Sequence, residues 1–540
     1  MADSSKSGAP RSGATGKPRR PWRENLEAFG VAILMAILLK PMIIEAYQIP
    51  TPSMQPTLMG SSDAGVFDRI LVDKVCYEVF EPKRWDIAVF RYPIRRNQNY
   101  VKRIVGMPGD RLRIAGGNLY SVADSGDIDS IHRKPDRIQE GAWKQIYPAR
   151  RELDGSPEIL GEFFEGTTGS WKERGDDLQV SPSSRGHARL SFVDRKNGGI
   201  SNQIYDGYPL ATARAIRKHA RLGQTEGVQD VRFSFDVAPT SDFTKLVVEL
   251  KLVHAGEKEH TMLLEIENGK ARLRALVGNQ ERVASEPVDC SISGGTATEL
   301  SFAHIDDRLM ASCNGDRVGE LEVGDARFTL PLTARSVVLS VRTQGGGVAT
   351  YSNLVIDRDL HYVTQGLGDA LAELVPEGTE QVVENHVIRI PDTHYFMMGD
   401  NTLASADSRQ WKVFTVGMTD DGQMVDPTTH PEARTLHGNR RPWPLNAKPD
   451  NDENPVILRS KSEQTPDEVA LTNDNGEVFR LQTKLATNYS EQHMRFVDRD
   501  RTPFRQWAPT ERHVFFVPRE HILGRPVAAF WPLTRIGFIR

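Results

Sequence analysis

The sequence predicts a mainly β protein that follows a single N-terminal membrane-spanning helix. Two observations indicate the β structure: short runs rich in Val, Ile and Phe recur along the chain, and Asn-Gly turn pairs such as Asn268-Gly269 and Asn314-Gly315 separate several of them. A third observation, the unbroken apolar run Ala28–Leu39 after a basic tail, indicates the helix. A chain of 540 residues is long enough for two to four folding units.

The N-terminal region divides into a basic tail, residues 1–24, and a predicted transmembrane helix, residues 25–46. Six basic residues face only two acidic residues in the tail, whose Ser, Gly and Pro content is typical of disorder. A helix from Leu26 to Ala46 would be about 32 Å long, enough to cross a bilayer. A cleaved signal peptide has a similar basic flank and apolar core, but no A-x-A cleavage site follows Ile44. The basic flank therefore predicts a cytoplasmic tail and an exoplasmic location for everything after residue 46.

Composition and residue spacing exclude several kinds of protein. The formal net charge of −4 does not indicate the excess of basic residues that nucleic-acid binding requires. The 14 histidines show no metal-ligand spacing. We therefore expect no metal, no other cofactor and no nucleic-acid partner. Three cysteines, Cys76, Cys290 and Cys313, cannot build a disulfide framework. One bridge between Cys290 and Cys313 is possible in an oxidising compartment, and buried free thiols are the alternative.

Strand patterns differ along the chain. Residues 47–114 contain short β-rich runs punctuated by Pro and Gly, whereas residues 115–185 are polar and show no clear pattern. From about 186 to 360, repeated alternating runs such as Val231–Val237 predict a β-sandwich. Residues 412–512 are polar again.

The polar stretch before the C-terminal segment contains one clear structural signal. Val469–Leu481, centred on Asn475-Gly476, is typical of a β-hairpin. The segment Val514–Trp531 that follows is apolar and is expected to form a closing strand.

Two segments after the predicted helix contain a serine and a lysine that together point to hydrolytic chemistry. Ser53 lies in Gln48–Leu58 between prolines that stiffen the backbone, although a lone serine in such a place is usually a turn residue. Lys102 lies in Tyr100–Asp110, within an otherwise apolar strand, where the alternative is a lysine that guards a sheet edge. Burial lowers the pKa of a lysine, and a neutral amine can accept a proton from a serine.

A third segment collects polar side chains. Phe396–Asn401 and the nearby Ser405–Arg409 bring two carboxylates, an arginine and two hydroxyls within a short stretch. The simplest interpretation is a solvated turn with a local ion pair, and the functional interpretation is a rigid polar shell around a reactive pair. A fourth segment, Phe516–Pro532, is typical of a closing turn and strand.

Taken in order, these segments resemble those of the type I signal peptidases, also called leader peptidases. A membrane helix precedes Ile-Pro-x-x-Ser-Met-x-Pro-Thr-Leu at 49–58, Asp-Ile-Ala-Val-Phe at 86–90, Tyr-Val-Lys-Arg-Ile-Val-Gly-Met-Pro-Gly-Asp at 100–110, Met-Gly-Asp-Asn at 398–401 and Ser-Ala-Asp-Ser-Arg at 405–409. The resemblance covers residues 26–120, 385–411 and 514–532. It implies a signal-peptidase-type β catalytic core.

The resemblance also implies a role for each matching residue. Ser53 is the expected nucleophile and Lys102 the expected general base. Thr51 and the backbone N–H of Ser53 are expected to form the oxyanion hole, and Ser405 to orient the Lys102 amine. The other matches are Arg103, Asp400, Asp407 and Arg409 as supporting ion pairs, and Tyr47, Ile49, Met54 and Val101 as the lining of a pocket for small substrate side chains.

The sequence departs from the family pattern in three places. Thr402-Leu403-Ala404 stands where the family has Arg-Asp-Asn, which removes a supporting carboxylate. A long stretch separates Lys102 from Gly399, and a second one precedes the closing strand. The strands inserted first resemble a concanavalin-like or laminin-G-like jelly roll, notably at Leu300–Leu309.

These departures give an expected domain division. The catalytic core comprises residues 47–120, 385–411 and 513–540. Insertions at 121–384, with the β-sandwich at about 186–360, and at 412–512 interrupt it.

The resemblance implies a membrane-bound serine endopeptidase that removes N-terminal signal peptides from exported preproteins after small residues. We expect a single-pass protein of the bacterial plasma membrane, with preproteins, the lipid bilayer and the secretion translocon as partners. The alternative is a membrane-tethered sandwich that binds glycans or proteins on a degenerate peptidase scaffold. Loss of Ser53 or Lys102 would favour that alternative, but both residues are present.

Two other Ser-Lys proteins fit less well. A self-cleaving regulator is disfavoured by the anchor and by the absence of a DNA-binding module. A penicillin-binding enzyme requires Ser-x-x-Lys, and the sequence after Ser53 has Pro56 at the lysine position.

Overall fold

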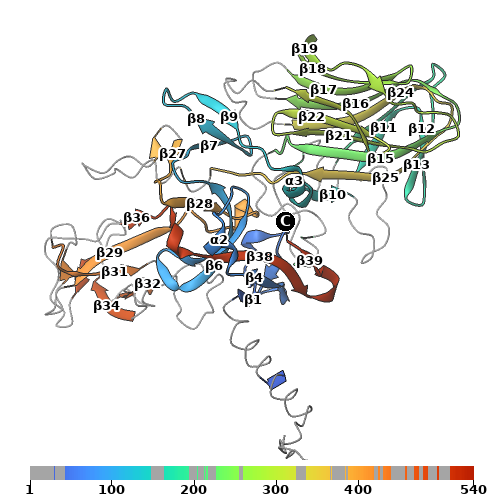
Figure 1. Ribbon diagram of the computed structural model, residues 1–540. Coiled ribbons are helices and arrows are strands. Elements are labelled where there is room, and N and C mark those ends of the chain that lie inside the picture. Colours follow the sequence, from blue (N-terminus) through green and yellow to red (C-terminus); the bar gives the residue numbers. More distant parts are fainter. Residues whose placement is uncertain are drawn as a thin grey trace, which may run out of the picture.

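The computed structural model shows a mainly β protein, as the sequence predicts (Figure 1). It describes residues 43–147, 163–193, 227–253, 259–323, 336–364, 387–418 and 511–539, with short pieces at 29–30, within 204–216, at 367 and 383–384, and within 424–497. Strands make up most of the described elements, and the described helices are short.

The first sheet joins segments that lie far apart in the sequence. Its central strand β6 (Arg95–Gly106) lies between β5 (Ile87–Tyr92) and β28 (His394–Met398). Antiparallel pairing continues outward on both sides, so that N-terminal and C-terminal segments share one sheet. The other strands are β1 (Ile44–Gln48), β4 (Arg69–Asp73), β37 (Val517–Pro518), β38 (Ile522–Trp531) and β39 (Gly537–Phe538).

A second, five-stranded sheet packs beside the first. Its order is β26-β27-β7-β8-β9, and Leu112 and Ile114 of β7 share a core with Phe396 and Met398 of β28. Leu360, Tyr362 and Leu367 join the same core. Its strands are β7 (Arg111–Ala115), β8 (Asn118–Val122), β9 (Ile128–Ile131), β26 (Val383–Glu384) and β27 (Val387–Arg389).

Two eight-stranded antiparallel sheets, called here the paired sheets, lie between β9 and β26 in the sequence. One has the order β12-β13-β25-β15-β21-β22-β23, with β10 beside β25. The other has the order β11-β14-β24-β16-β17-β18-β19, with β20 beside β18.

The strands of the first paired sheet are β10 (Lys144–Tyr147), β12 (Ser170–Arg174), β13 (Asp177–Ser181), β15 (Val231–Pro239), β21 (Thr298–Ile305), β22 (Arg308–Cys313), β23 (Asp316–Glu322) and β25 (Ala349–Arg358). Those of the second are β11 (Phe164–Thr168), β14 (His187–Phe192), β16 (Phe243–Val253), β17 (His260–Glu267), β18 (Lys270–Val277), β19 (Gln280–Ala284), β20 (Val288–Asp289) and β24 (Ser336–Gly345).

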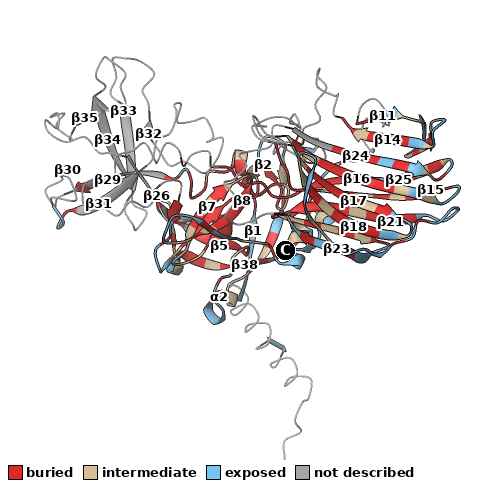
Figure 2. Cartoon of the chain, turned by 90° about the horizontal axis from the view of Figure 1, so that it is seen from above, coloured by how far each residue is buried: buried red, intermediate tan, exposed pale blue. Residues whose placement is uncertain are grey.

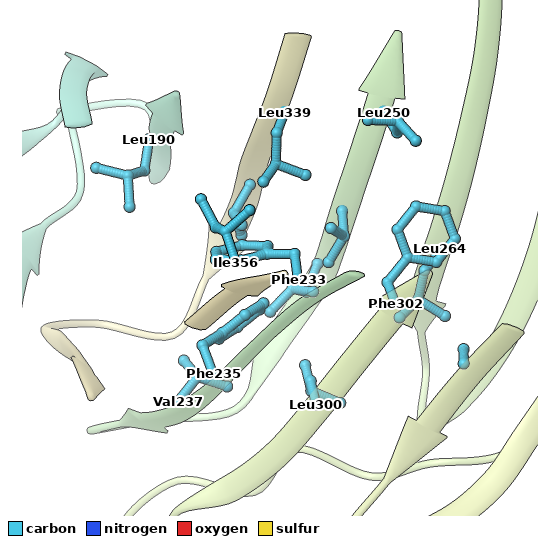
Figure 3. Close-up of a cluster of buried hydrophobic side chains, with 14 of the residues drawn as sticks. Leu190, Phe233, Phe235, Val237, Leu250, Leu264, Leu300, Phe302, Leu339 and Ile356 are labelled. Atoms are coloured by element: carbon cyan, nitrogen blue, oxygen red, sulfur yellow. The ribbon is translucent and has the colours of Figure 1, made fainter. Parts of the chain in front are cut away.

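A single hydrophobic core lies between the paired sheets. Along β15, buried and half-buried residues alternate, so Phe233 and Phe235 lie on the same face of the sheet. They contact apolar side chains of the opposite sheet in one cluster, among them Leu250 and Leu339 (Figure 3). Figure 2 shows buried residues along strands of both sheets. Cys290 and Cys313 form a disulfide at this core.

The paired sheets extend further toward the N-terminus than the pattern in the sequence predicted. The predicted start near residue 186 is corrected by β10–β13, which begin at Lys144 and belong to the two sheets. The sequence pattern did not predict β11 and β12, because most of their residues are exposed and apolar residues do not alternate along them. Leu360 and Tyr362, near the C-terminal end of the expected insertion, pack in the core of the second sheet.

The last sheet contains residues between 412 and 513. The predicted hairpin is present as the antiparallel pair β33–β34, in which Val469 lies opposite Leu481. Its strands are β29 (Lys412–Met418), β30 (Met424–Val425), β31 (Arg434–Gly438), β32 (Ile457–Leu458), β33 (Asp467–Thr472), β34 (Val478–Lys484), β35 (Arg495–Val497) and β36 (Glu511–His513).

Short elements complete the described chain. They are the helices α2 (Cys76–Val79) and α3 (Asp136–Ala142), the 3-10 turns η1 (Pro52–Met54), η2 (Thr402–Ala404), η4 (Arg519–His521) and η5 (Leu533–Arg535), and the hairpin β2 (Gly60–Ser61) and β3 (Val66–Phe67).

The predicted transmembrane helix, residues 25–46, lies mostly outside the described residues. Among the helices that the structure does describe, none has the length and apolar character needed to cross a bilayer. One part of the prediction is corrected: Ile44–Ala46 are not helical, because they belong to β1, which pairs antiparallel with β4 from Ile44↔Asp73 to Gln48↔Arg69. Pairing with β4 overrides the helical pattern at this end.

Candidate active site

Ser53 lies in η1, directly after β1. Its side chain is buried, and the turn is fixed by neighbouring backbone contacts. The Asn401 backbone N–H donates to the Ser53 carbonyl at 3.1 Å, and the Asn401 side-chain amide donates to the Pro52 carbonyl at 3.0 Å. A Cβ atom at Gly399 would lie only 2.3 Å from the Ser53 carbonyl oxygen. Glycine at 399 therefore allows the two loops to meet.

Lys102 reaches Ser53 from the central strand of the first sheet. The Lys102 Nζ donates to the Ser53 Oγ at 2.6 Å, and both residues are 2% exposed. Lys102 lies opposite Ala88 of β5, and β28 pairs on the other side of β6. Lys102 is therefore an interior lysine, and the edge-guarding interpretation is wrong.

Thr51 lies beside Ser53. Its Oγ1 is 3.3 Å from the Ser53 Oγ, within hydrogen-bonding distance. A hydroxyl in this place, together with the Ser53 backbone N–H, has the donor chemistry of an oxyanion hole.

Arg103 and Asp400 form a buried bidentate ion pair behind Ser53. The Arg103 Nε and Nη2 each donate to a different Asp400 carboxylate oxygen at 2.7 Å, and both side chains are fully buried. Burial raises the pKa of the Asp400 carboxyl, but the charge and hydrogen bonds of Arg103 outweigh burial and bring that pKa below its usual value. Asp400 is therefore held as a carboxylate.

Asp407 and Arg409 form a second buried ion pair. The Arg409 Nε and Nη2 donate to the two Asp407 carboxylate oxygens at 2.8 and 2.9 Å. Asp407 also accepts the Gly399 backbone N–H at 3.1 Å, and Arg409 donates to the Thr402 carbonyl at 2.8 Å. This pair fixes the backbone that carries Asp400, so the solvated-turn interpretation of the segment is wrong.

Ser405 differs from its expected arrangement. It is buried, and a Cβ atom at Gly399 would lie 2.3 Å from the Ser405 Oγ. That oxygen has no hydrogen-bond partner among the described residues. The expected contact from Ser405 to the Lys102 amine is therefore not formed here.

A small cavity opens beside Ser53 between β1 and β6. Its volume is about 160 Å³, and its lining includes all four pocket residues expected from the sequence. The lining also contains residues that were not expected there, among them Val89 and Asn99. The Asn99 amide donates to the Tyr47 hydroxyl at 3.4 Å across the opening. The expected lining residues are Tyr47, Ile49, Met54 and Val101.

Part of the chain matches a known protein family. The family model described as "Signal peptidase, peptidase S26" matches residues 22–142 and 361–426. "Probable signal peptidase I-1" of Synechocystis is 34% identical over 152 residues, covering 26% of this chain and 70% of the relative. The chain belongs to the signal peptidase family.

Other signal peptidases are also similar to part of the chain. "Signal peptidase I" of Pseudomonas fluorescens is 38% identical over 163 residues, covering 26% of this chain and 56% of the relative. "Probable signal peptidase I-2" of Synechocystis is 33% identical over 108 residues, with 19% and 47% covered. The chain thus spans about half the length of these two curated relatives.

Solved structures also resemble parts of the chain. A carbohydrate-binding module from Bacillus subtilis is 8% identical with a TM-score of 0.22, covering 36% of this chain and 96% of that one. Galectin LEC-6 of Caenorhabditis elegans is 13% identical with a TM-score of 0.17, covering 25% and 84%. Likeness at this level carries no argument about function.

The signal peptidase match is interrupted where the paired sheets occur. The matched residues stop at 142 and resume at 361, and β10 to β25 lie between them. Two residues for which the sequence predicted no role meet at this junction: Thr57, from the motif at 49–58, and Lys144. Thr57 donates to Asp400 at 2.5 Å, and Lys144 donates to Thr57 at 2.9 Å.

Proposed function

We propose that the chain is a membrane-bound signal peptidase I, a serine endopeptidase that removes N-terminal signal peptides from exported preproteins after small residues. The observation that carries this proposal is the 2.6 Å hydrogen bond between Lys102 and Ser53, both buried beside a small cavity. A nucleophile and a base within hydrogen-bonding distance are the signature of covalent acyl-transfer catalysis.

The reaction follows from the positions of three groups. The Lys102 amine takes the Ser53 hydroxyl proton as the Ser53 Oγ bonds to the substrate carbonyl carbon. The Ser53 N–H and the Thr51 hydroxyl stabilise the oxyanion of the tetrahedral intermediate. Lys102 then gives its proton to the leaving amine, and the signal peptide remains as an ester on Ser53. Water, activated by Lys102, hydrolyses that ester, and neither step requires a cofactor.

Substrate binding uses β1 and the cavity. In the described sheet β1 lies at the edge, with β4 as its partner strand, and residues of β1 line the cavity. An extended peptide can add to such an edge by backbone hydrogen bonds, while its alternate side chains enter the pocket. The cavity measures about 160 Å³ in all, and it favours small side chains if more than one of these alternate side chains has to enter it.

Peptides that differ only in the residue before the scissile bond test this specificity. With alanine at that position we expect efficient cleavage, and with phenylalanine a value of kcat/KM lower by about 100-fold or more, because the ring would take up space that the neighbouring alternate side chain of the peptide also needs. The measurement is product formation by the detergent-solubilised full chain. Equal cleavage of both peptides would contradict the proposed pocket.

We infer that the catalytic core is assembled from residues 47–120, 385–411 and 513–540. The first sheet supports this division, because it joins β1, β4 to β6, β28, β37 and β38. The paired sheets then form an insertion of the concanavalin-like or laminin-G-like type, and the sheet from 412 to 512 forms a second insertion.

We also propose a single-pass topology in the bacterial plasma membrane, with residues 1–24 in the cytoplasm and the rest after residue 46 outside. The lipid bilayer and the secretion translocon are the expected partners. The Cys290–Cys313 disulfide supports this location, since such bonds persist in oxidising compartments.

Protease added to intact spheroplasts tests the topology. We expect the domain after residue 46 to be digested while a tag fused before residue 24 stays protected. Protection of the large domain, with digestion only after lysis, would refute the proposed orientation.

A further inference from the structure

Lys144 connects the paired sheets with the candidate active site. It is the first residue of β10, and it lies opposite Arg358 of β25. In the sequence it follows the end of the first signal peptidase match, residue 142, by two positions. Its side chain nevertheless contacts the loop that follows Ser53. Lys144 is 4% exposed.

The contacts of Lys144 lead directly to the loops that hold Ser53. The Lys144 Nζ donates to the Thr57 Oγ1 at 2.9 Å and to the Gly141 carbonyl at 3.1 Å. The Thr57 hydroxyl in turn donates to an Asp400 carboxylate oxygen at 2.5 Å. Thr57 follows Ser53 by four residues, and Asp400 directly precedes Asn401, whose N–H binds the Ser53 carbonyl.

The charges around Lys144 make it a costly residue to bury. Burial is the largest effect and lowers the pKa of the Lys144 ammonium to about 8. The Asp400 and Asp359 carboxylates raise this pKa, and the Arg103 and Arg358 guanidiniums lower it. Burial thus destabilises the charged form of Lys144. Side chains whose pKa values are shifted strongly by burial cluster at functional sites.

A cavity lies beside Lys144. The cavity has a volume of about 400 Å³ and lies between the end of the first sheet and the start of the paired sheets. Thr57, Trp143, Lys144, Arg535 and Phe538 are among its lining residues. This cavity is separate from the substrate cavity beside Ser53, because the two have no lining residue in common.

We propose that Lys144 is a positioning residue of the peptidase: supplied by the insertion, it holds Thr57 and Asp400 in place and thereby fixes the Ser53 loop in its reactive geometry. This inference rests on the proposed function. It makes the paired sheets part of the catalytic apparatus, so the insertion cannot be exchanged for a flexible linker without loss of rate.

The test compares Lys144→Met with the unchanged full chain on a short peptide. We expect kcat to fall about 10-fold or more with little change in KM, because a displaced Ser53 loop lowers reactivity rather than peptide affinity. Lys144→Arg keeps a cation near Thr57 and should recover part of the rate. Lys172→Met, the same substitution at an exposed lysine of β12, should have no effect.

Thermal unfolding separates positioning from a merely structural role. Removing a buried cation should leave the unfolding midpoint of Lys144→Met unchanged or raised, whereas a structural role predicts a lowered midpoint.

The stability of the unchanged chain should also depend on pH. The Lys144 pKa of about 8 in the folded chain lies below its usual 10.5, so the unfolded chain binds more protons between these values. The unchanged chain should therefore gain stability relative to Lys144→Met as pH rises through that window.

The pH–rate profile gives a third readout. Deprotonation of Lys144 removes its charge from beside Asp400, so the rate of the unchanged chain should fall above about pH 8. That fall in rate should be absent in Lys144→Met and should occur at higher pH in Lys144→Arg.

Two results would count against the proposals in different ways. An active chain whose Lys144→Met variant has the same rate and pH profile would overturn this inference alone. A chain that cleaves no peptide would instead refute the proposed function, and this inference with it.

Discussion

Ser53→Ala and Lys102→Ala should each lower the rate of peptide cleavage by at least about 10³-fold, since the nucleophile and its base act as one unit. The reason is the buried hydrogen bond between the two side chains. Without Ser53 no acyl-enzyme forms, and without Lys102 the hydroxyl keeps its proton. The measurement is kcat/KM of each variant on the same peptide.

A Lys102→Arg variant sharpens the test of the base. Arginine does not deprotonate in proteins and cannot take the Ser53 proton, so this variant should be as inactive as Lys102→Ala. The exposed Lys172→Ala serves as the matched control with unchanged activity. Circular dichroism should show that all variants fold. Turnover within about tenfold of the unchanged chain by any folded dyad variant would refute the assignment.

Asp400→Ala should lower the free energy of unfolding by about 3–5 kcal/mol. The carboxylate is fully buried and holds the equally buried Arg103 through two hydrogen bonds. Its removal leaves an uncompensated buried charge, which is more costly than the loss of the pair as a whole. Chemical denaturation measures the change, and Lys270→Ala, which breaks an exposed ion pair with Asp289, is the control.

Two further comparisons examine this ion pair. The double variant Arg103→Met/Asp400→Leu should lose less stability than Asp400→Ala, because it leaves no charge unpaired.

The stabilisation by Asp400 should also depend on pH. Asp400 has a pKa below its usual 3.8, so its contribution to the free energy of unfolding is fully present above about pH 4 and is lost as pH falls through the lower, folded-state value. The unchanged chain, but not Asp400→Ala, should show this loss. Equal stability of the unchanged chain and Asp400→Ala would contradict the role of the pair.

The two candidate catalytic residues could be proposed from the sequence because each lies in a short motif. Ser53 and Lys102 come from two such motifs, and the structure brings their side chains to 2.6 Å. The partners Arg103 and Asp400 were likewise marked, although 297 residues separate them. The motifs could not predict the burial of Lys102, because it depends on the pairing of β5 and β28 with the two sides of β6.

Other features depend on contacts that no local pattern records. Thr57 and Lys144 are 87 residues apart and meet only because the paired sheets lie against the first sheet. Ser405 was marked by its motif, yet its hydroxyl has no partner among the described residues. At the N-terminal side, β1 extends back to Ile44 because β4 offers it a pairing edge, which the apolar pattern could not reveal.

Cleavage of a preprotein by the detergent-solubilised full chain tests the central claim most directly. The substrate should carry a signal peptide that ends in Ala-x-Ala, and mass spectrometry should identify the new N-terminus. We expect release of the mature protein with cleavage directly after the last alanine, and no release by the Ser53→Ala variant. An intact preprotein after incubation with the folded, unchanged chain, or equal processing by Ser53→Ala, would contradict the account.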